Sequence, residues 1–181
     1  MKRELGDRLQ IEWRYFSLEQ VNQKHGPDWK VWDQPASYES RGNPSFMAAE
    51  AARRQGEDAF LRMHEELLKA RHEEKRLFTD RETLMLAAQR AGLDLERFQR
   101  DLEDRSLLQK LARDHTEAVE RYQAFGVPTF IFENGQAAYL KMYPPAPKEQ
   151  AVAVFEELYQ TTCLRPFIYE LKRPGEHWPK K

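Results

Sequence analysis

The sequence is poor in cysteine: its 181 residues contain one, Cys163. A single thiol excludes a disulfide within the chain, a four-cysteine zinc site and a Cys-x-x-Cys redox motif. Cys163 follows the last predicted helix, in TTCLRPF. A lone thiol in such a place is typical of a small apolar filler rather than a nucleophile. We therefore assign no catalytic residue to these 181 residues.

Long apolar runs and an excess of one charge are also missing. No run approaches the roughly 20 apolar residues that a membrane helix needs, and the first ten residues lack the apolar segment of a signal peptide. The 29 basic and 30 acidic residues leave a formal net charge of -1, which gives nucleic acid no basic surface. His64 and His72 are not at the i, i+4 spacing of metal ligands, so we predict no metal site. We expect a cytoplasmic protein without a membrane or nucleic-acid partner.

The apolar residues that are present predict one folded domain over residues 1–181. They make up 40% of the chain, enough for a full core. Leu9, Ile11, Trp13 and Tyr15 alternate as in a strand over 9–16, after a short helix end at 2–5. Residues 17–44 are rich in turn formers and predict a long loop.

That loop carries Trp29 and Trp32 in PDWKVWDQP. Large aromatic side chains commonly pin a loop to the core, and this is one interpretation of the pair. The other is that the loop shapes a binding groove, since long loops in compact domains are often functional.

Helical periodicity extends from about residue 45 to 125. Three stop or start signals divide it into four or five helices: Gly56, a capping box over Thr79–Glu82, and an N-cap at Asp94. The last helix, 106–125, has an apolar stripe that includes His115, which we interpret as a surface histidine or a satisfied core histidine.

The segment FGVPTFIFENG, residues 125–135, changes the period from helix to strand. It predicts a strand over 129–133, a turn at Asn134-Gly135 and a partner strand over 137–142, followed by a helix over 148–159. Pro128 cannot donate to a ladder. Its place between a long helix and a hairpin favours a cis peptide bond over a proline that only begins the strand.

This order of elements resembles the DsbA-like branch of the thioredoxin superfamily. Gly126-Val127-Pro128-Thr129 is similar to that superfamily's cis-proline loop, and FIFENGQAAYLKM to its hairpin. IEWRYFSLEQVN and the tail over 167–174 resemble a subgroup of thiol-dependent nitroreductases. The resemblance implies an α/β thioredoxin-like fold with a helical insertion at about 45–125 and a strand, hairpin and helix over 126–160.

The resemblance also implies a function. It is thiol-disulfide oxidoreduction, or reduction that depends on a low-molecular-weight thiol such as glutathione or mycothiol, acting on a small-molecule or protein thiol or disulfide. The main chain of Val127 would bind the substrate and Pro128 would flank the reacting sulfur. The expected substrate-binding residues are Gly126, Val127, Pro128, Thr129, Trp29 and Trp32.

The family's first strand, its Cys-x-x-Cys or Cys-x-x-Ser motif and the following helix have no counterpart here. We expect Met1 to be an internal methionine, so that enzymatic activity depends on an upstream motif. Two alternatives stay open. One is a glutathione-dependent isomerase of the 2-hydroxychromene-2-carboxylate type. The other is a redox-inactive binding module that works by strand addition, with a homodimer as one form open to it.

Overall fold

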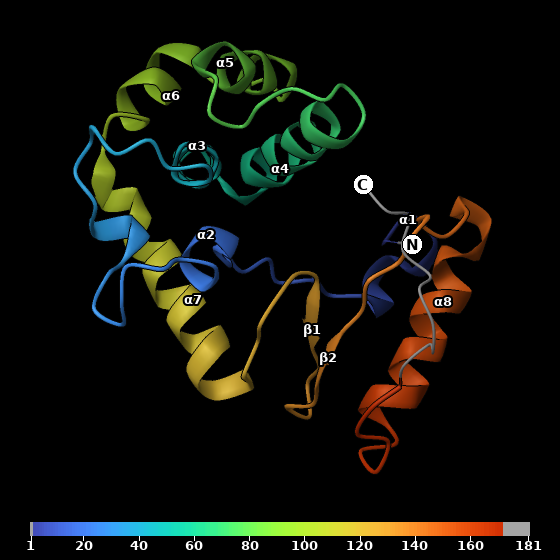
Figure 1. Ribbon diagram of the computed structural model, residues 1–181. Helices are drawn as coiled ribbons and strands as arrows, with labels where there is room; N and C mark the ends of the chain where they lie inside the picture. The colour runs from blue at the N-terminus through green and yellow to red at the C-terminus, as the bar shows by residue number, and fades with distance from the viewer. Residues whose placement is uncertain (1, 172–181) are drawn as a thin grey trace. The chain divides into compact units, whose positions relative to one another are not determined.

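The computed structural model describes residues 2–171, which form two compact units (Figure 1). Residues 14–117 form a helical unit. Residues 2–13 and 118–171 form a second unit, which contains the only sheet found among the described residues. The end of the tail over 167–174, from Lys172 onward, lies outside the described residues.

The helical unit is built from α-helices, with a long loop between the first two of them and shorter connections between the others (Figure 1). Its helices are α2 (Leu18–Val21), α3 (Asn43–Arg53), α4 (Glu57–His72), α5 (Arg81–Arg90), α6 (Leu95–Asp101) and the larger part of α7 (Leu108–Tyr122), with 3-10 turns at Val31–Asp33 and Arg105–Leu107. Fully buried side chains from four of these helices meet in one core, among them Phe60, Met63, Leu84, Phe98 and Leu111. The buried alanines of α3 allow its neighbours to approach closely, so α3 lies at the centre of this packing.

The helix signals in the sequence were largely right. Helix α3 ends before Gly56, whose φ of 119° suits glycine. Asp94 caps α6 by accepting the N–H of Arg97 at 3.0 Å. The capping box over Thr79–Glu82 was wrong, because α5 begins one residue later. The N-cap of α5 is Asp80, and its side chain makes no capping hydrogen bond. Thr79 and Glu82 are therefore not at the N-cap and N3 positions that a capping box needs.

The strand predicted over 9–16 was also wrong, since this stretch forms no strand. Only part of the expected face is buried: Leu9 and Tyr15 are, whereas Ile11 and Trp13 are about two-fifths exposed. The N–H of Tyr15 donates to the Asp114 carboxylate at 3.1 Å, and that of Ser17 to the His115 ring at 3.1 Å. Side chains of α7 thus accept hydrogen bonds from backbone N–H groups that would donate to a neighbouring strand if this stretch were part of a sheet.

The second unit contains a short hairpin and a closing helix. Its elements are α1 (Lys2–Leu5), a 3-10 turn (Gly6–Arg8), β1 (Thr129–Ile131), β2 (Ala137–Tyr139), a 3-10 turn (Lys148–Gln150), α8 (Ala151–Leu158) and a π-helical end (Tyr159–Cys163). The strands are antiparallel, with Phe130 opposite Ala138, and the predicted Asn134-Gly135 turn joins them. Phe130 and Phe132 face Phe155 and Tyr159, with ring centroids 6.4 and 5.5 Å apart. These contacts attach the hairpin to the closing helix.

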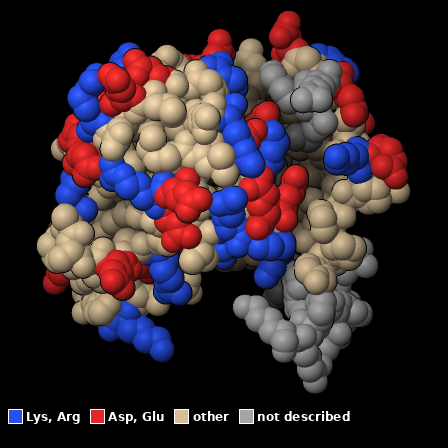
Figure 2. All heavy atoms as spheres, turned by 90° about the horizontal axis from the view of Figure 1, so that it is seen from above, with Lys and Arg blue, Asp and Glu red and all other residues tan. Residues whose placement is uncertain are grey.

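Figure 2 shows acidic and basic side chains interleaved on the face in view. This pattern agrees with the nearly balanced charge of the chain. Between residues 2 and 171, none of the helices has the length and apolar character needed to cross a membrane.

Candidate functional site

The segment between α7 and β1 is a structured loop that holds three of the predicted site residues, Gly126, Val127 and Pro128, and the fourth, Thr129, begins β1. The Val127–Pro128 peptide bond is cis. The Thr129 hydroxyl donates to the carbonyl of Gly126 at 2.7 Å, and the N–H of Leu140 donates to the carbonyl of Pro128 at 3.3 Å. Two hydrogen bonds therefore fix the loop on either side of Val127.

Val127 itself is presented outward. Its side chain is 44% exposed. Neither its N–H nor its C=O has a hydrogen-bond partner among residues 2–171. A main-chain donor and acceptor that a fixed loop holds without a partner, in an exposed residue, can pair with an extended ligand, as an added strand would.

Apolar side chains surround this loop. Phe125 is 66% exposed and its ring lies 4.9 Å from that of Tyr139 on β2. Gly126 is buried under the same ring: a Cβ there would lie 3.0 Å from Cε2 of Tyr139. A side chain at position 126 would make the Tyr139 ring shift by a few tenths of an ångström. Phe125, Val127 and Tyr139 form an apolar rim.

Cys163 is buried, 2% exposed, at the end of the π-helical turn. Its carbonyl accepts the Asn134 side-chain amide at 2.9 Å, which ties the turn of the hairpin to the end of the last helix. The neighbouring Tyr159 hydroxyl donates to Glu133, and this bond, with a smaller contribution from Cys163, raises the pKa of Tyr159 to about 12. The thiol occupies a packed position, away from solvent.

The predicted tryptophans belong to the helical unit, not to the unit that holds the Val127 loop. The Gln20 side chain organises their segment: its amide donates to the carbonyl of Trp29 at 2.9 Å, and its oxygen accepts the N–H of Val31 at 2.8 Å. Trp29 stacks on His25, with centroids 4.7 Å apart. Trp32 packs against the helical core. Both indoles are half-buried.

Sequence reasoning missed Asp114 on α7, and it recognised the neighbouring His115 only as a member of the apolar stripe of that helix. Asp114 is 3% exposed, and besides the N–H of Tyr15 it binds Arg14 at 3.2 Å and Lys110 at 3.0 Å. His115 is 5% exposed. Burial, and less strongly the positive charge of Lys30, lower the pKa of His115 to about 4. The signal available was the apolar stripe of α7, which includes His115 but gives no sign of its partners.

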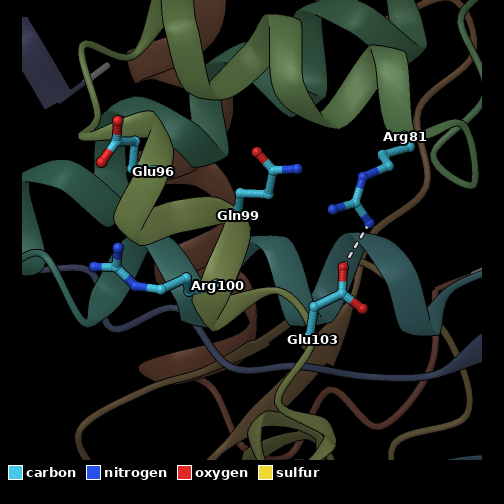
Figure 3. A pocket seen from close by; sticks show the side chains of 5 residues that line it. All are labelled: Arg81, Glu96, Gln99, Arg100 and Glu103. Atoms are coloured by element: carbon cyan, nitrogen blue, oxygen red, sulfur yellow. Dashed lines mark hydrogen bonds and ion pairs between the residues drawn. The ribbon is translucent and has the colours of Figure 1, made fainter.

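A shallow surface cleft lies between α5 and α6 (Figure 3). It is lined by Arg81, Glu96, Gln99, Arg100 and Glu103. Arg81 and Glu103 form an ion pair at 2.7 Å, and both side chains are more than half exposed. Two cations and two anions at a solvated surface define no preferred ligand. In the described part of the chain, no three His, Cys, Asp or Glu side chains gather as metal ligands would.

A family model of the DSBA-like thioredoxin domain matches residues 4–155. The chain therefore belongs to this family. Its mostly helical structure with a small two-stranded sheet is consistent with an α/β thioredoxin-like fold. The family is one of thiol-disulfide oxidoreductases, and the loop before β1 lies within the match. No curated protein matches the chain.

Proposed function

We propose that the chain acts in thiol-disulfide exchange by binding an extended thiol or disulfide substrate along the main chain of Val127. The observation that carries the proposal is the pair of unpartnered main-chain groups of Val127, held in a loop that two hydrogen bonds fix. Membership of the DSBA-like family supports a sulfur-bearing ligand at this place. The apolar rim would cover the carbon atoms next to the sulfur.

The reacting thiolate in this proposal comes from a low-molecular-weight thiol such as glutathione or mycothiol, because Cys163 is buried. The thiolate attacks one sulfur of the substrate disulfide, forms a mixed disulfide and releases the other sulfur as a thiolate. A second thiol attacks the mixed disulfide, which releases the remaining substrate thiolate and leaves the oxidised thiol. The protein's part is to hold the mixed disulfide beside Pro128 while the second thiol attacks.

The binding step can be tested by NMR. Oxidised glutathione and S-methylglutathione are titrated into the 15N-labelled chain, and the amide signals of Gly126, Val127 and Thr129 are followed. We expect saturable shifts centred on Val127, because its N–H gains a hydrogen-bond partner. If the shifts map elsewhere, or do not saturate with glutathione or mycothiol derivatives, the proposal is wrong.

Two matched variants test whether binding depends on the Val127 loop or on the rest of the hairpin. Val127→Asp places a carboxylate beside the carboxylates of glutathione, and we expect binding to weaken about tenfold, the equivalent of roughly 1.4 kcal/mol. Ile131→Asp is the control, since Ile131 is 41% exposed compared with 44% for Val127. It should leave the affinity within about twofold, a difference below roughly 0.5 kcal/mol.

A second candidate is a redox-inactive module that binds a peptide by strand addition. The exposed apolar rim and the two-stranded sheet of the described residues favour it. The two functions differ in turnover. With glutathione and hydroxyethyl disulfide, the exchange function predicts formation of oxidised glutathione above the uncatalysed rate, and the binding module predicts none. An isomerase would use glutathione without oxidising it.

A further inference from the structure

The ring of His115 is held in one tautomer. Its Nδ1 accepts the N–H of Ser17 at 3.1 Å, so in the neutral ring the proton is on Nε2. The pKa of His115, lowered to about 4 by burial and by Lys30, keeps the ring neutral at pH 7. The Nε2–H is therefore a fixed hydrogen-bond donor.

This donor has nothing to bind within the described chain. Nε2 has no hydrogen-bond partner among residues 2–171. It is not among the fully buried side-chain atoms of these residues that lack a partner, so it is in contact with solvent. The residue is nevertheless 5% exposed. A nearly buried ring thus presents one polar N–H at an opening to solvent, which is uncommon because buried donors are generally paired.

The surroundings of the donor are aromatic and positive. The His115 ring lies 4.7 Å from that of Phe16 and 5.4 Å from that of Trp32, and both neighbours are half-buried. Lys30, also half-buried, is the charged group whose field reaches the imidazole. Aromatic surface, a fixed N–H and a nearby cation together suit a flat ligand that carries an anionic acceptor.

We propose that His115, Phe16, Trp32 and Lys30 form a binding site for a small aromatic carboxylate, with the Nε2–H of His115 donating to a carboxylate oxygen. Phe16 and Trp32 contact the ring of the ligand, and the ammonium group of Lys30 attracts its charge. The site lies wholly within the helical unit and does not depend on the Val127 loop.

The probe for the test is benzoate. It is titrated into the full chain at pH 7, with the 15N signal of the His115 Nε2 and the fluorescence of the chain as readouts. We expect a saturable change in both, and benzamide, which has the same ring but no charge, should bind about tenfold more weakly. Absence of a saturable change, or equal affinity for the two compounds, would overturn the proposal.

Variants distinguish loss of the Nε2 hydrogen-bond donor from loss of the folded structure. His115→Asn retains an oxygen that can accept the N–H of Ser17 and removes the Nε2 donor, so benzoate should bind at least about tenfold more weakly in a folded chain. Lys30→Gln leaves the ring in place and should weaken benzoate but not benzamide. His64→Asn is the control, because His64 lies on α4 outside this cluster, and it should change neither affinity. Unaltered benzoate binding by a folded His115→Asn chain contradicts the proposal, and if that variant does not fold, the Lys30→Gln comparison decides.

Discussion

The carboxylate of Asp114 accepts the backbone N–H of Tyr15 at 3.1 Å, joining residues 99 positions apart. Asp114 is almost fully buried and also binds Arg14 and Lys110, so its charge is balanced by two cations and a peptide group. Together with the bond from Ser17 to His115, it fixes the start of the long loop to α7. One helix thereby determines the path of a segment that has no sheet partner.

Replacement of Asp114 by alanine is expected to lower the free energy of unfolding by about 2–3 kcal/mol, because the N–H of Tyr15 loses its partner inside the protein. Asp114→Asn retains an acceptor and should cost less. Glu103→Ala, which removes an exposed ion pair, should change the free energy of unfolding by no more than about 0.5 kcal/mol. Urea unfolding measures all three, and equal effects for Asp114→Ala and Glu103→Ala would contradict this role.

The buried His115 predicts a loss of stability in mild acid. Its pKa falls from 6.5 to about 4 on folding, so the unfolded chain binds more protons between these values. The free energy of unfolding should therefore fall as the pH drops from about 6.5 to about 4, with no further loss from this group below that. Other groups titrate as well, so the measurement is the difference between the native chain and His115→Asn. That difference should change across this window, and a constant difference would show that His115 is not linked to folding.

Gly126→Ala is expected to destabilise the second unit by about 1 kcal/mol, since the added Cβ would lie 3.0 Å from the Tyr139 ring and force it to move. The effect should largely vanish in a Tyr139→Ala background, where the ring is absent. A double-mutant cycle measures this coupling. Additive effects of the two substitutions would show that the ring yields without cost.

Cys163 should react slowly with thiol reagents in the folded chain. Its 2% exposure leaves the sulfur little access to the reagent, and reactivity requires an accessible thiolate. We expect the rate of reaction with Ellman's reagent to rise at least about a hundredfold in denaturant, in proportion to the population of open chains. Similar rates in folded and unfolded chains would show a surface thiol, and the source of the reacting thiolate would have to be reconsidered.

Local signals carried most of what the sequence predicted. Helix spans, the stop at Gly56 and the hairpin turn depend on neighbouring residues, and the structure places them close to the expected positions. The segment 9–16 failed because its outcome depends on Asp114 and His115, about a hundred residues away. Alternation of apolar residues could not reveal that side chains would replace a strand partner.

The candidate site was predictable only in part, for the same reason. Proline after a long helix identified the loop at 126–129. The exposure of Val127 and the ring above Gly126 depend on how β2 returns, which no local pattern encodes. His115 was visible on its stripe, but a stripe does not show which edge of an imidazole meets solvent.

The Asn134-Gly135 turn has a consequence for the chemical ageing of the protein. In an Asn-Gly pair the glycine nitrogen can attack the asparagine amide, releasing ammonia and leaving an aspartyl or isoaspartyl residue. Here the Gly135 N–H donates to the carbonyl of Phe132 at 2.9 Å, and the Asn134 amide is bound to the carbonyl of Cys163. Both reacting groups are occupied, so the folded hairpin protects its own turn from deamidation. The Asn134 amide loses its part of this protection when the hairpin separates from the end of the last helix.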